Sequence, residues 1–195
     1  MHGGANTSGI VGIWLKISFR LAKVLSRIGL SANTLSLLGV IFALGASLAS
    51  PRAWCIFFLS LSLLSDGVDG SVAILSNRTS KMGSLLDSIA DRAAEAFWFL
   101  ALYRLGVSLP LLFAAWLIAS FQEYARARMG SGGVREIGVV TVAERPVRAC
   151  FIFLAMLSWQ FSFSREWINP LTGILTALQL MGFVQVLRFA HSSLK

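Results

Sequence analysis

The feature that most constrains the fold of this chain is a succession of six long apolar segments. They cover residues 33–50, 53–75, 84–104, 108–127, 146–163 and 168–188. As helices, such segments match the roughly 30 Å hydrocarbon core of a bilayer. Only 13% of the 195 residues are charged, against roughly 25% in a soluble domain, and the mean hydropathy is +0.73. We therefore predict an all-α integral membrane protein with six transmembrane helices.

A basic amphipathic segment, residues 10–28, precedes the apolar ones. Its four cations are Lys16, Arg20, Lys23 and Arg27. Their spacing of three or four residues places them in one stripe on a helix, with apolar residues between them. This pattern is typical of a helix lying in the membrane interface and facing anionic lipids, and a solvated basic arm is the alternative. Residues 1–9 are predicted to be disordered, and residues 10–195 to form a single membrane domain.

The distribution of basic residues predicts the topology. With the N-terminus inside, thirteen of the 17 Lys and Arg residues fall in inner segments and three in outer loops, while Arg92 lies within a helix. Because inner loops are enriched in Lys and Arg, we predict a multi-pass protein of the cell (inner or plasma) membrane with both termini cytoplasmic. The cations punctuate apolar stretches, so the net charge of +8 indicates anionic lipids rather than nucleic acid as a partner.

All four aspartates of the chain lie within or at the end of apolar segments. They are Asp66, Asp69, Asp87 and Asp91. A carboxylate at the centre of a spanning helix costs roughly 3 kcal/mol, so these groups need a partner. Spacings of i, i+3 in the first pair and i, i+4 in the second put each pair on one helix face. At 1.5 Å per residue, antiparallel helices bring both pairs to matching depths, roughly 6–12 Å from the inner edge.

Convergence of four carboxylates predicts a metal site on the inner side of the membrane. Oxygen ligands without His or Cys favour Mg²⁺, Mn²⁺ or Ca²⁺ over Zn²⁺. The glycines beside them pack helices closely and would let a ligand approach the backbone. Two other interpretations are a set of helix-packing hydrogen bonds and the ion or proton path of a transporter.

The run Asp66-x2-Asp69-Gly70-x2-Ala73-Ile74-x8-Gly83-x3-Asp87-x3-Asp91 resembles the signature of the CDP-alcohol phosphotransferase family. Residues 78–92 are especially similar to actinobacterial phosphatidylinositol-phosphate synthases. The resemblance implies transfer of a phosphatidyl or other substituted phosphoryl group from a CDP-alcohol such as CDP-diacylglycerol to a polar acceptor. It further implies that CMP is released and that the reaction belongs to phospholipid biosynthesis. It also implies a homodimer.

The same resemblance implies roles for individual residues. Asp66, Asp69 and Asp87 would hold one or two Mg²⁺ or Mn²⁺ ions, with Asp91 bridging or close by and acting as general base toward the acceptor hydroxyl. The residues implied at the nucleotide are Gly70, Ala73 and Gly83. The main departure from the family pattern is Ile74, which stands where the family has Arg. Milder departures are Ala32 and Ser36, where relatives often have Pro and Thr.

The departure at Ile74 leaves two hypotheses. Arg78 lies one helical turn further on the same face and would supply the missing charge toward the nucleotide. Alternatively, the chain is a degenerate homologue that binds nucleotide or lipid without turnover.

Five arginines cluster around the inner connection between the fourth and fifth apolar segments. They are Arg126, Arg128, Arg135, Arg145 and Arg148. Arg binds phosphate with two parallel hydrogen bonds, so the cluster predicts a phosphorylated acceptor such as inositol phosphate, our first choice, or glycerol 3-phosphate. Simple positive-inside bias is the alternative for any one of them. We expect Glu123 and Glu144 to orient these arginines or meet acceptor hydroxyls, and Glu95 to extend the acidic face of the aspartates.

Overall fold

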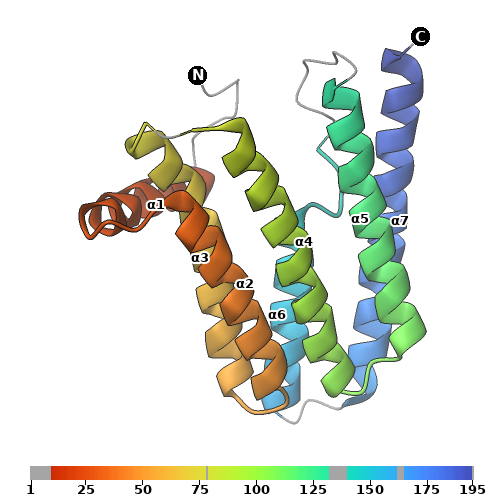
Figure 1. Cartoon of the computed structure of the whole chain (residues 1–195). Coiled ribbons are helices and arrows are strands. Elements are labelled where there is room, and N and C mark those ends of the chain that lie inside the picture. The colour runs from red at the N-terminus through yellow and green to blue at the C-terminus, as the bar shows by residue number, and fades with distance from the viewer. Residues whose placement is uncertain (1–9, 78, 132–139, 162–164, 195) are drawn as a thin grey trace. The chain divides into compact units, whose positions relative to one another are not determined.

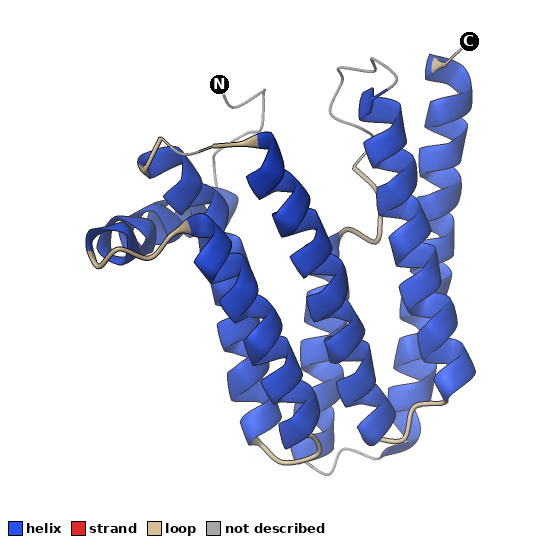
Figure 2. Cartoon of the chain, in the orientation of Figure 1, coloured by secondary structure: helices blue, strands red, loops and turns tan. Residues whose placement is uncertain are grey.

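A computed structural model describes residues 10–77, 79–131, 140–161 and 165–194. Within these ranges the chain is helical and contains no strand (Figure 2). The elements are α1 Ile10–Arg27, α2 Ala32–Ala49, α3 Trp54–Leu75, α4 Lys81–Arg104, α5 Leu109–Ser131, α6 Arg145–Gln160, the short 3₁₀ helix η1 Arg165–Trp167, and α7 Ile168–Ser193. The predicted all-α architecture is confirmed, and each apolar segment corresponds to one α-helix.

Three of the described helices are long and apolar enough to cross a membrane, namely α2, α3 and α7. Since α6 has only 16 residues and α4 carries several ionisable groups, a count of six spanning helices stays a prediction. The chain is a membrane protein whose remaining helices are shorter or more polar than an ordinary span.

Contacts divide the chain into two compact units. One contains Met1–Phe42 and Ser60–Ala94, and the other contains Ala43–Leu59 and Glu95–Lys195. Helices α2, α3 and α4 each continue from one unit into the other, so neither unit is a separate stretch of sequence. That residues 10–195 form a single domain stays a prediction.

In the first unit, α1 lies crosswise to α2 and α3 (Figure 1). Its small residue Ala22 is fully buried and packs with Leu35 of α2 and with Val68 and Val72 of α3. The four cations of α1 all lie on its exposed side. The predicted amphipathic helix is therefore confirmed as a helix with a basic outer face, and its location at a lipid interface stays a prediction.

A tight connection links α1 to α2. Gly29 adopts a positive φ of 82°, and the N–H groups of Gly29 and Leu30 donate to the carbonyls of Ser26 and Leu25. This is the Schellman arrangement, for which glycine is favoured because it has no Cβ. Two residues later, Ser31 caps α2 by accepting the N–H of Thr34 at 3.2 Å. The first turn of α2 is thereby held beside the end of α3.

Helices α2 and α3 run antiparallel and are joined by a turn at residues 50–53. In the first unit they approach closely at Gly39, where an added Cβ would lie 3.6 Å from the carbonyl oxygen of Ser62. The Ser62 hydroxyl donates to the carbonyl of Gly39 at 2.8 Å. This buried contact sets the register of the two helices.

In the second unit, α5 and α7 lie side by side, and α6 also packs against α7 (Figure 1). The N–H of Ser108 donates to Asn169 Oδ1 at 3.3 Å, which joins the starts of α5 and α7. Gly182 of α7 allows a close approach, because an added Cβ would lie 3.2 Å from both Gln122 Oε1 and Thr141 Oγ1. The small residue lets polar side chains of α5 and of the α5–α6 connection reach α7.

Candidate metal centre

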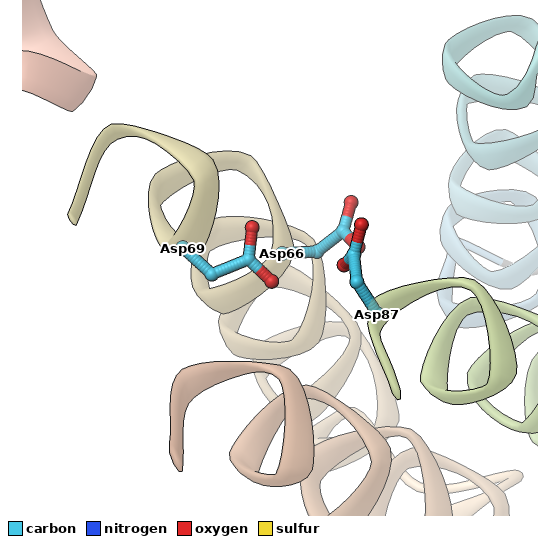
Figure 3. Close-up of side chains that lie close together, drawn as sticks. All are labelled: Asp66, Asp69 and Asp87. Carbon is cyan, nitrogen blue, oxygen red and sulfur yellow. The ribbon is translucent and has the colours of Figure 1, made fainter. Parts of the chain in front are cut away.

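Three of the four aspartates converge in the first unit. Asp66 and Asp69 project from α3 toward Asp87 of α4 (Figure 3). One carboxylate oxygen from each lies within 4.8 Å of the others. Asp69 is buried, with 6% of its surface exposed, whereas the other two are half-buried. We call these three residues the aspartate cluster.

Local structure explains how α4 contributes its member of the cluster. Ser80 precedes α4, and its hydroxyl accepts the N–H of Gly83 at 2.9 Å, the bond of a helix N-cap. The cap fixes the first turn of α4, and Asp87 follows in the second turn. On α3, the i, i+3 spacing of Asp66 and Asp69 gives them a common face.

A hydroxyl from a third helix completes the immediate surroundings. Ser36 of α2 donates to Asp69 Oδ2 at 2.7 Å. The sequence pattern did not assign a role to Ser36. The antiparallel pairing of the first two apolar segments could have indicated it, because this pairing brings the start of residues 33–50 to the depth of Asp69 near the end of residues 53–75.

A cavity of about 210 Å³ opens beside the aspartate cluster. Its lining consists of Ala32, Asn33, Ser36, Asp69, Gly70, Ala73, Thr79, Ser80, Gly83, Ser84 and Asp87. The three small residues that the resemblance implied at the nucleotide, Gly70, Ala73 and Gly83, all line it. Apart from the neighbouring backbone of α3, no heavy atom of the described residues lies within 4 Å of a Cβ built on Gly70, so a ligand has room to approach the backbone there.

The aspartate cluster fits a hard divalent cation. Carboxylate oxygens that share one Mg²⁺ or Ca²⁺ ion at about 2.0–2.6 Å lie at most about 4–5 Å apart, comparable with the 4.8 Å limit observed. The donors are oxygens only, which suits Mg²⁺ and Mn²⁺. Asp66, Asp69 and Asp87 are therefore able to hold such an ion.

Other residues of the predicted site have different outcomes. Asp91 lies one turn after Asp87 on α4, is half-buried, and is not a member of the three-carboxylate group; its roles as ligand and general base stay predictions. Ile74 is 61% exposed. Arg78 lies outside the described residues, so its proposed compensation for Ile74 is untested.

In the second unit, the predicted arginines meet glutamates. Arg126 of α5 forms a two-bond pair with Glu144, at 2.8 Å from Nη1 to Oε2 and 2.5 Å from Nη2 to Oε1. Arg126 Nη1 also lies 3.6 Å from Glu123 Oε1. The carboxylate of Glu144 accepts both the N–H and the hydroxyl of Thr141. The expectation that Glu123 and Glu144 orient the arginines is consistent with these contacts.

Arg148 is fully buried, and so is its partner Glu95. Its Nε donates to Glu95 Oε1, its Nη1 donates to the carbonyl of Ala143 at 2.8 Å, and its Nη2 lies 3.5 Å from Glu123 Oε1. The expectation that Glu95 extends the acidic face of the aspartates is therefore wrong. A buried carboxylate is stable beside a guanidinium that offers several donors, and Glu95 has such a partner.

We call Glu95, Glu123, Arg126, Glu144 and Arg148 the arginine–glutamate cluster. Of the other arginines predicted to bind an acceptor, Arg145 stacks over the Trp98 ring at 5.4 Å from its centroid, and Arg128 is exposed. Arg135 lies outside the described residues. The structure thus brings Arg126 and Arg148 together through Glu123, which contacts both. Acceptor binding by any of the five arginines stays a prediction.

The Glu144 carboxyl lies just before α6 and carries a perturbed pKa. Burial alone would raise its pKa, but hydrogen bonds from Arg126 and Thr141 and the positive charge of Arg126 lower it from 4.5 to about 2. Glu144 therefore stays ionised at any physiological pH and holds the start of α6 against α5.

Residues 28–185 match the family model described as CDP-alcohol phosphatidyltransferase. The chain belongs to this family. It is thus an enzyme of the CDP-alcohol phosphotransferase class, which transfers substituted phosphoryl groups in phospholipid biosynthesis. The resemblance inferred from the spacing of the aspartates is confirmed over most of the chain.

Similar proteins include an archaetidylinositol phosphate synthase of Aeropyrum pernix, 37% identical over 139 residues that cover 68% of this chain and 71% of the relative. A phosphatidylinositol phosphate synthase of Cutibacterium acnes is 31% identical, with 68% and 70% coverage. One of Mycolicibacterium smegmatis is 26% identical, with 85% and 82% coverage. The actinobacterial similarity is confirmed, and archaeal enzymes share it.

The fold is similar to that of solved structures of Mycobacterium tuberculosis phosphatidylinositol phosphate synthase. The complex with manganese and citrate gives a TM-score of 0.72 at 21% identity, covering 90% of this chain and 89% of that one. The complex with CDP-DAG gives a TM-score of 0.67 at the same identity, with 90% and 92% coverage. A manganese ion is thus present in a protein of this fold.

Proposed function

We propose that this chain transfers a lipid-bearing phosphoryl group from a CDP-linked lipid to a phosphorylated polyol, with inositol phosphate as the first choice, and releases CMP. The single observation that carries this proposal is the aspartate cluster beside a cavity lined by small and hydroxyl-bearing residues. The three relatives described above are named as inositol phosphate lipid synthases, which supports the choice of acceptor.

In this proposal the cavity receives the polar head of the donor. Gly70 and Ala73 of α3 and Gly83 of α4 lie beside it without bulky side chains, so a nucleotide can contact the backbone. Arg78 is proposed to balance charge on the nucleotide phosphates. The relatives carry names from both archaetidyl and phosphatidyl lipids, so the hydrocarbon part of the donor is left to experiment.

Asp66, Asp69 and Asp87 are proposed to hold Mg²⁺ or Mn²⁺, one ion or two, with Asp91 close by. When bound, such a cation neutralises phosphate charge and stabilises negative charge on the transferred phosphoryl group. Asp91 is proposed to accept the proton of the acceptor hydroxyl. The hydroxyl oxygen then bonds to the lipid-bearing phosphorus, the bond from that phosphorus to CMP breaks, and the proton passes to solvent.

The acceptor is proposed to bind at the predicted arginines. In the arginine–glutamate cluster two guanidinium charges meet three carboxylates, so little positive charge is left there for a phosphate. Arg128, whose side chain is exposed, is the most accessible of the described candidates, and Arg145 remains part of this proposal with it. Arg135 remains part of this proposal.

We also propose that the active site and both termini face the cytoplasm and that α1 contacts anionic lipid. Thirteen inner against three outer cations support the orientation, and the exposed basic face of α1 supports the lipid contact. A homodimer is proposed on the resemblance alone.

The experiment is a CMP-release assay on the purified chain in lipid nanodiscs with Mn²⁺. The donors are CDP-diacylglycerol and CDP-archaeol, and the acceptors are inositol phosphate, free inositol and glycerol 3-phosphate. We expect CMP release to be fastest with inositol phosphate and to stop in Asp91→Asn, which retains nucleotide binding. Absence of CMP with every pair, together with intact nucleotide binding, would support the degenerate homologue instead.

A further inference from the structure

We propose that Ser36 is a positioning residue of the metal centre, acting through Asp69. The inference rests on the proposed metal site and adds a residue to it from a third helix, α2. Ser36 is half-buried, lines the cavity and makes a direct hydrogen bond to the most buried carboxylate of the aspartate cluster.

The hydrogen bond has the geometry of a strong one. Ser36 Oγ lies 2.7 Å from Asp69 Oδ2, within the range of charge-assisted O–H···O⁻ bonds. A second acceptor, the carbonyl of Ala32, lies at 3.2 Å, which is the bond that a serine within a helix ordinarily makes. One hydroxyl carries one proton, and the shorter, charged acceptor receives it. Ser36 is thus committed to Asp69 rather than to its own helix.

This bond restricts the rotation of the Asp69 carboxylate. Ser36 engages one lone pair of Oδ2, and the backbone N–H of Gly70 also bonds the Asp69 carboxylate. The lone pairs that are left can face a cation shared with Asp66 and Asp87. Hydrogen bonds from outside a metal centre orient its ligands, and their loss typically weakens metal binding. Without the hydroxyl, Asp69 loses its bond to α2, and its carboxylate is less restrained from turning away from the other two like charges.

The α2–α3 pair contains a matched control. The Ser62 hydroxyl also bridges these helices, at 2.8 Å, but donates to the backbone carbonyl of Gly39 and is fully buried. Both serines contribute one hydroxyl to the same helix pair. Ser36 donates to a carboxylate of the cluster, whereas this bond of Ser62 goes to the backbone. A purely structural effect would therefore be shared by both serines, and an effect on the metal would belong to Ser36.

The test is direct Mn²⁺ binding by electron paramagnetic resonance on detergent-purified protein without nucleotide or acceptor. The key variants are Ser36→Thr and Ser36→Val, which have nearly the same shape and differ in the hydroxyl. We expect the Mn²⁺ dissociation constant to rise about 10-fold or more in Ser36→Val and to stay near the wild-type value in Ser36→Thr. Ser62→Ala is expected to lower the Tm and leave Mn²⁺ affinity unchanged.

Equal Mn²⁺ affinities for the Thr and Val variants, each with a cooperative thermal transition, would overturn the assignment. So would a wild-type chain that binds no Mn²⁺. Wild-type CMP release, measured in parallel, separates this inference from the proposed function. If Mn²⁺ binds with the expected dependence on Ser36 but no CMP forms, the proposed transfer fails while the role of Ser36 stands.

Discussion

The aspartate cluster and the arginine–glutamate cluster are both sets of carboxylates in a largely apolar chain, but their surroundings are opposite. Asp66, Asp69 and Asp87 face one another, and two like charges 4 Å apart repel by about 1 kcal/mol in water and about 4 kcal/mol near a protein surface. In the other cluster, Glu95 and Glu144 face guanidinium groups. The aspartate cluster is therefore arranged for a cation from solution, whereas the arginine–glutamate cluster carries its own countercharges.

The largest effect is expected from removing one charge from the aspartate cluster. Asp69→Asn keeps the shape of the side chain but removes a ligand and its charge. We predict that CMP release falls at least about 1,000-fold, corresponding to the several kcal/mol that a metal contributes to charge stabilisation. Thermal unfolding should show no loss of stability without metal, because a repulsion is relieved, and Mn²⁺ should raise the Tm of the wild type only.

A lower Tm for metal-free Asp69→Asn than for the metal-free wild type would contradict the proposed difference between the two clusters. It would mean that the carboxylate of Asp69 contributes to folding, as the carboxylates of the arginine–glutamate cluster do. The Ser36 hydroxyl, which bonds Asp69, still finds the side-chain oxygen of Asn as an acceptor, so loss of that bond would not explain the result.

In the arginine–glutamate cluster the opposite response is expected. Arg148→Met leaves Glu95 buried without its guanidinium, and removing one partner of a buried pair costs about 3–5 kcal/mol. We predict a large drop in the Tm with or without Mn²⁺. The double variant Arg148→Met with Glu95→Leu should recover much of the loss, because well-packed apolar residues replace buried pairs at little cost. A double variant no more stable than the single one would contradict this account.

The sequence predicted the aspartate cluster better than the arginine–glutamate cluster, for a physical reason. Asp66 and Asp69 have i, i+3 spacing on one helix, and Asp87 lies on the neighbouring antiparallel helix. Because the depth of each residue in the membrane can be counted along the chain, the convergence of these three carboxylates was predictable. The Arg148–Glu95 pair joins α6 to α4 across 53 residues. No local spacing specifies which face of α6 meets α4, so Glu95 was assigned to the wrong cluster.

The positions of the helices were also predictable, although α5 and α7 extend four and five residues beyond the predicted apolar segments. Gly29 ends α1 with a positive φ, and Pro146 occupies the first turn of α6 as proline does. Ser36 was missed because a single serine in an apolar helix has no distinctive pattern. Its role depends on the partner helix, which places Asp69 opposite it.

Acid should distinguish the two clusters on a smaller scale. The pKa of Glu144 is lowered from 4.5 to about 2, so its contribution to stability is complete above pH 4.5 and is lost as the pH falls toward 2. We predict that the Tm of the wild type falls more steeply between pH 5 and pH 2 than that of Glu144→Gln. Glu166→Gln, at an exposed position, is the control and should follow the wild type.

The smallest effect on stability is expected at Gly182 of α7, which packs closely against Thr141 beside the arginine–glutamate cluster. A Cβ at Gly182 would lie 3.2 Å from Thr141 Oγ1 and 3.3 Å from Thr141 Cβ, and Thr141 is tied to Glu144. Overpacking costs about 1–3 kcal/mol, while Ala gains about 1 kcal/mol over Gly in a helix. We therefore predict that Gly182→Ala lowers the free energy of unfolding by about 1 kcal/mol.

Gly173→Ala is the control, because Gly173 lies on the same helix with open space around it. This substitution should raise the free energy of unfolding. If both substitutions stabilise the chain equally, Thr141 yields easily, and the arginine–glutamate cluster is held by its ion pairs rather than by close packing against α7.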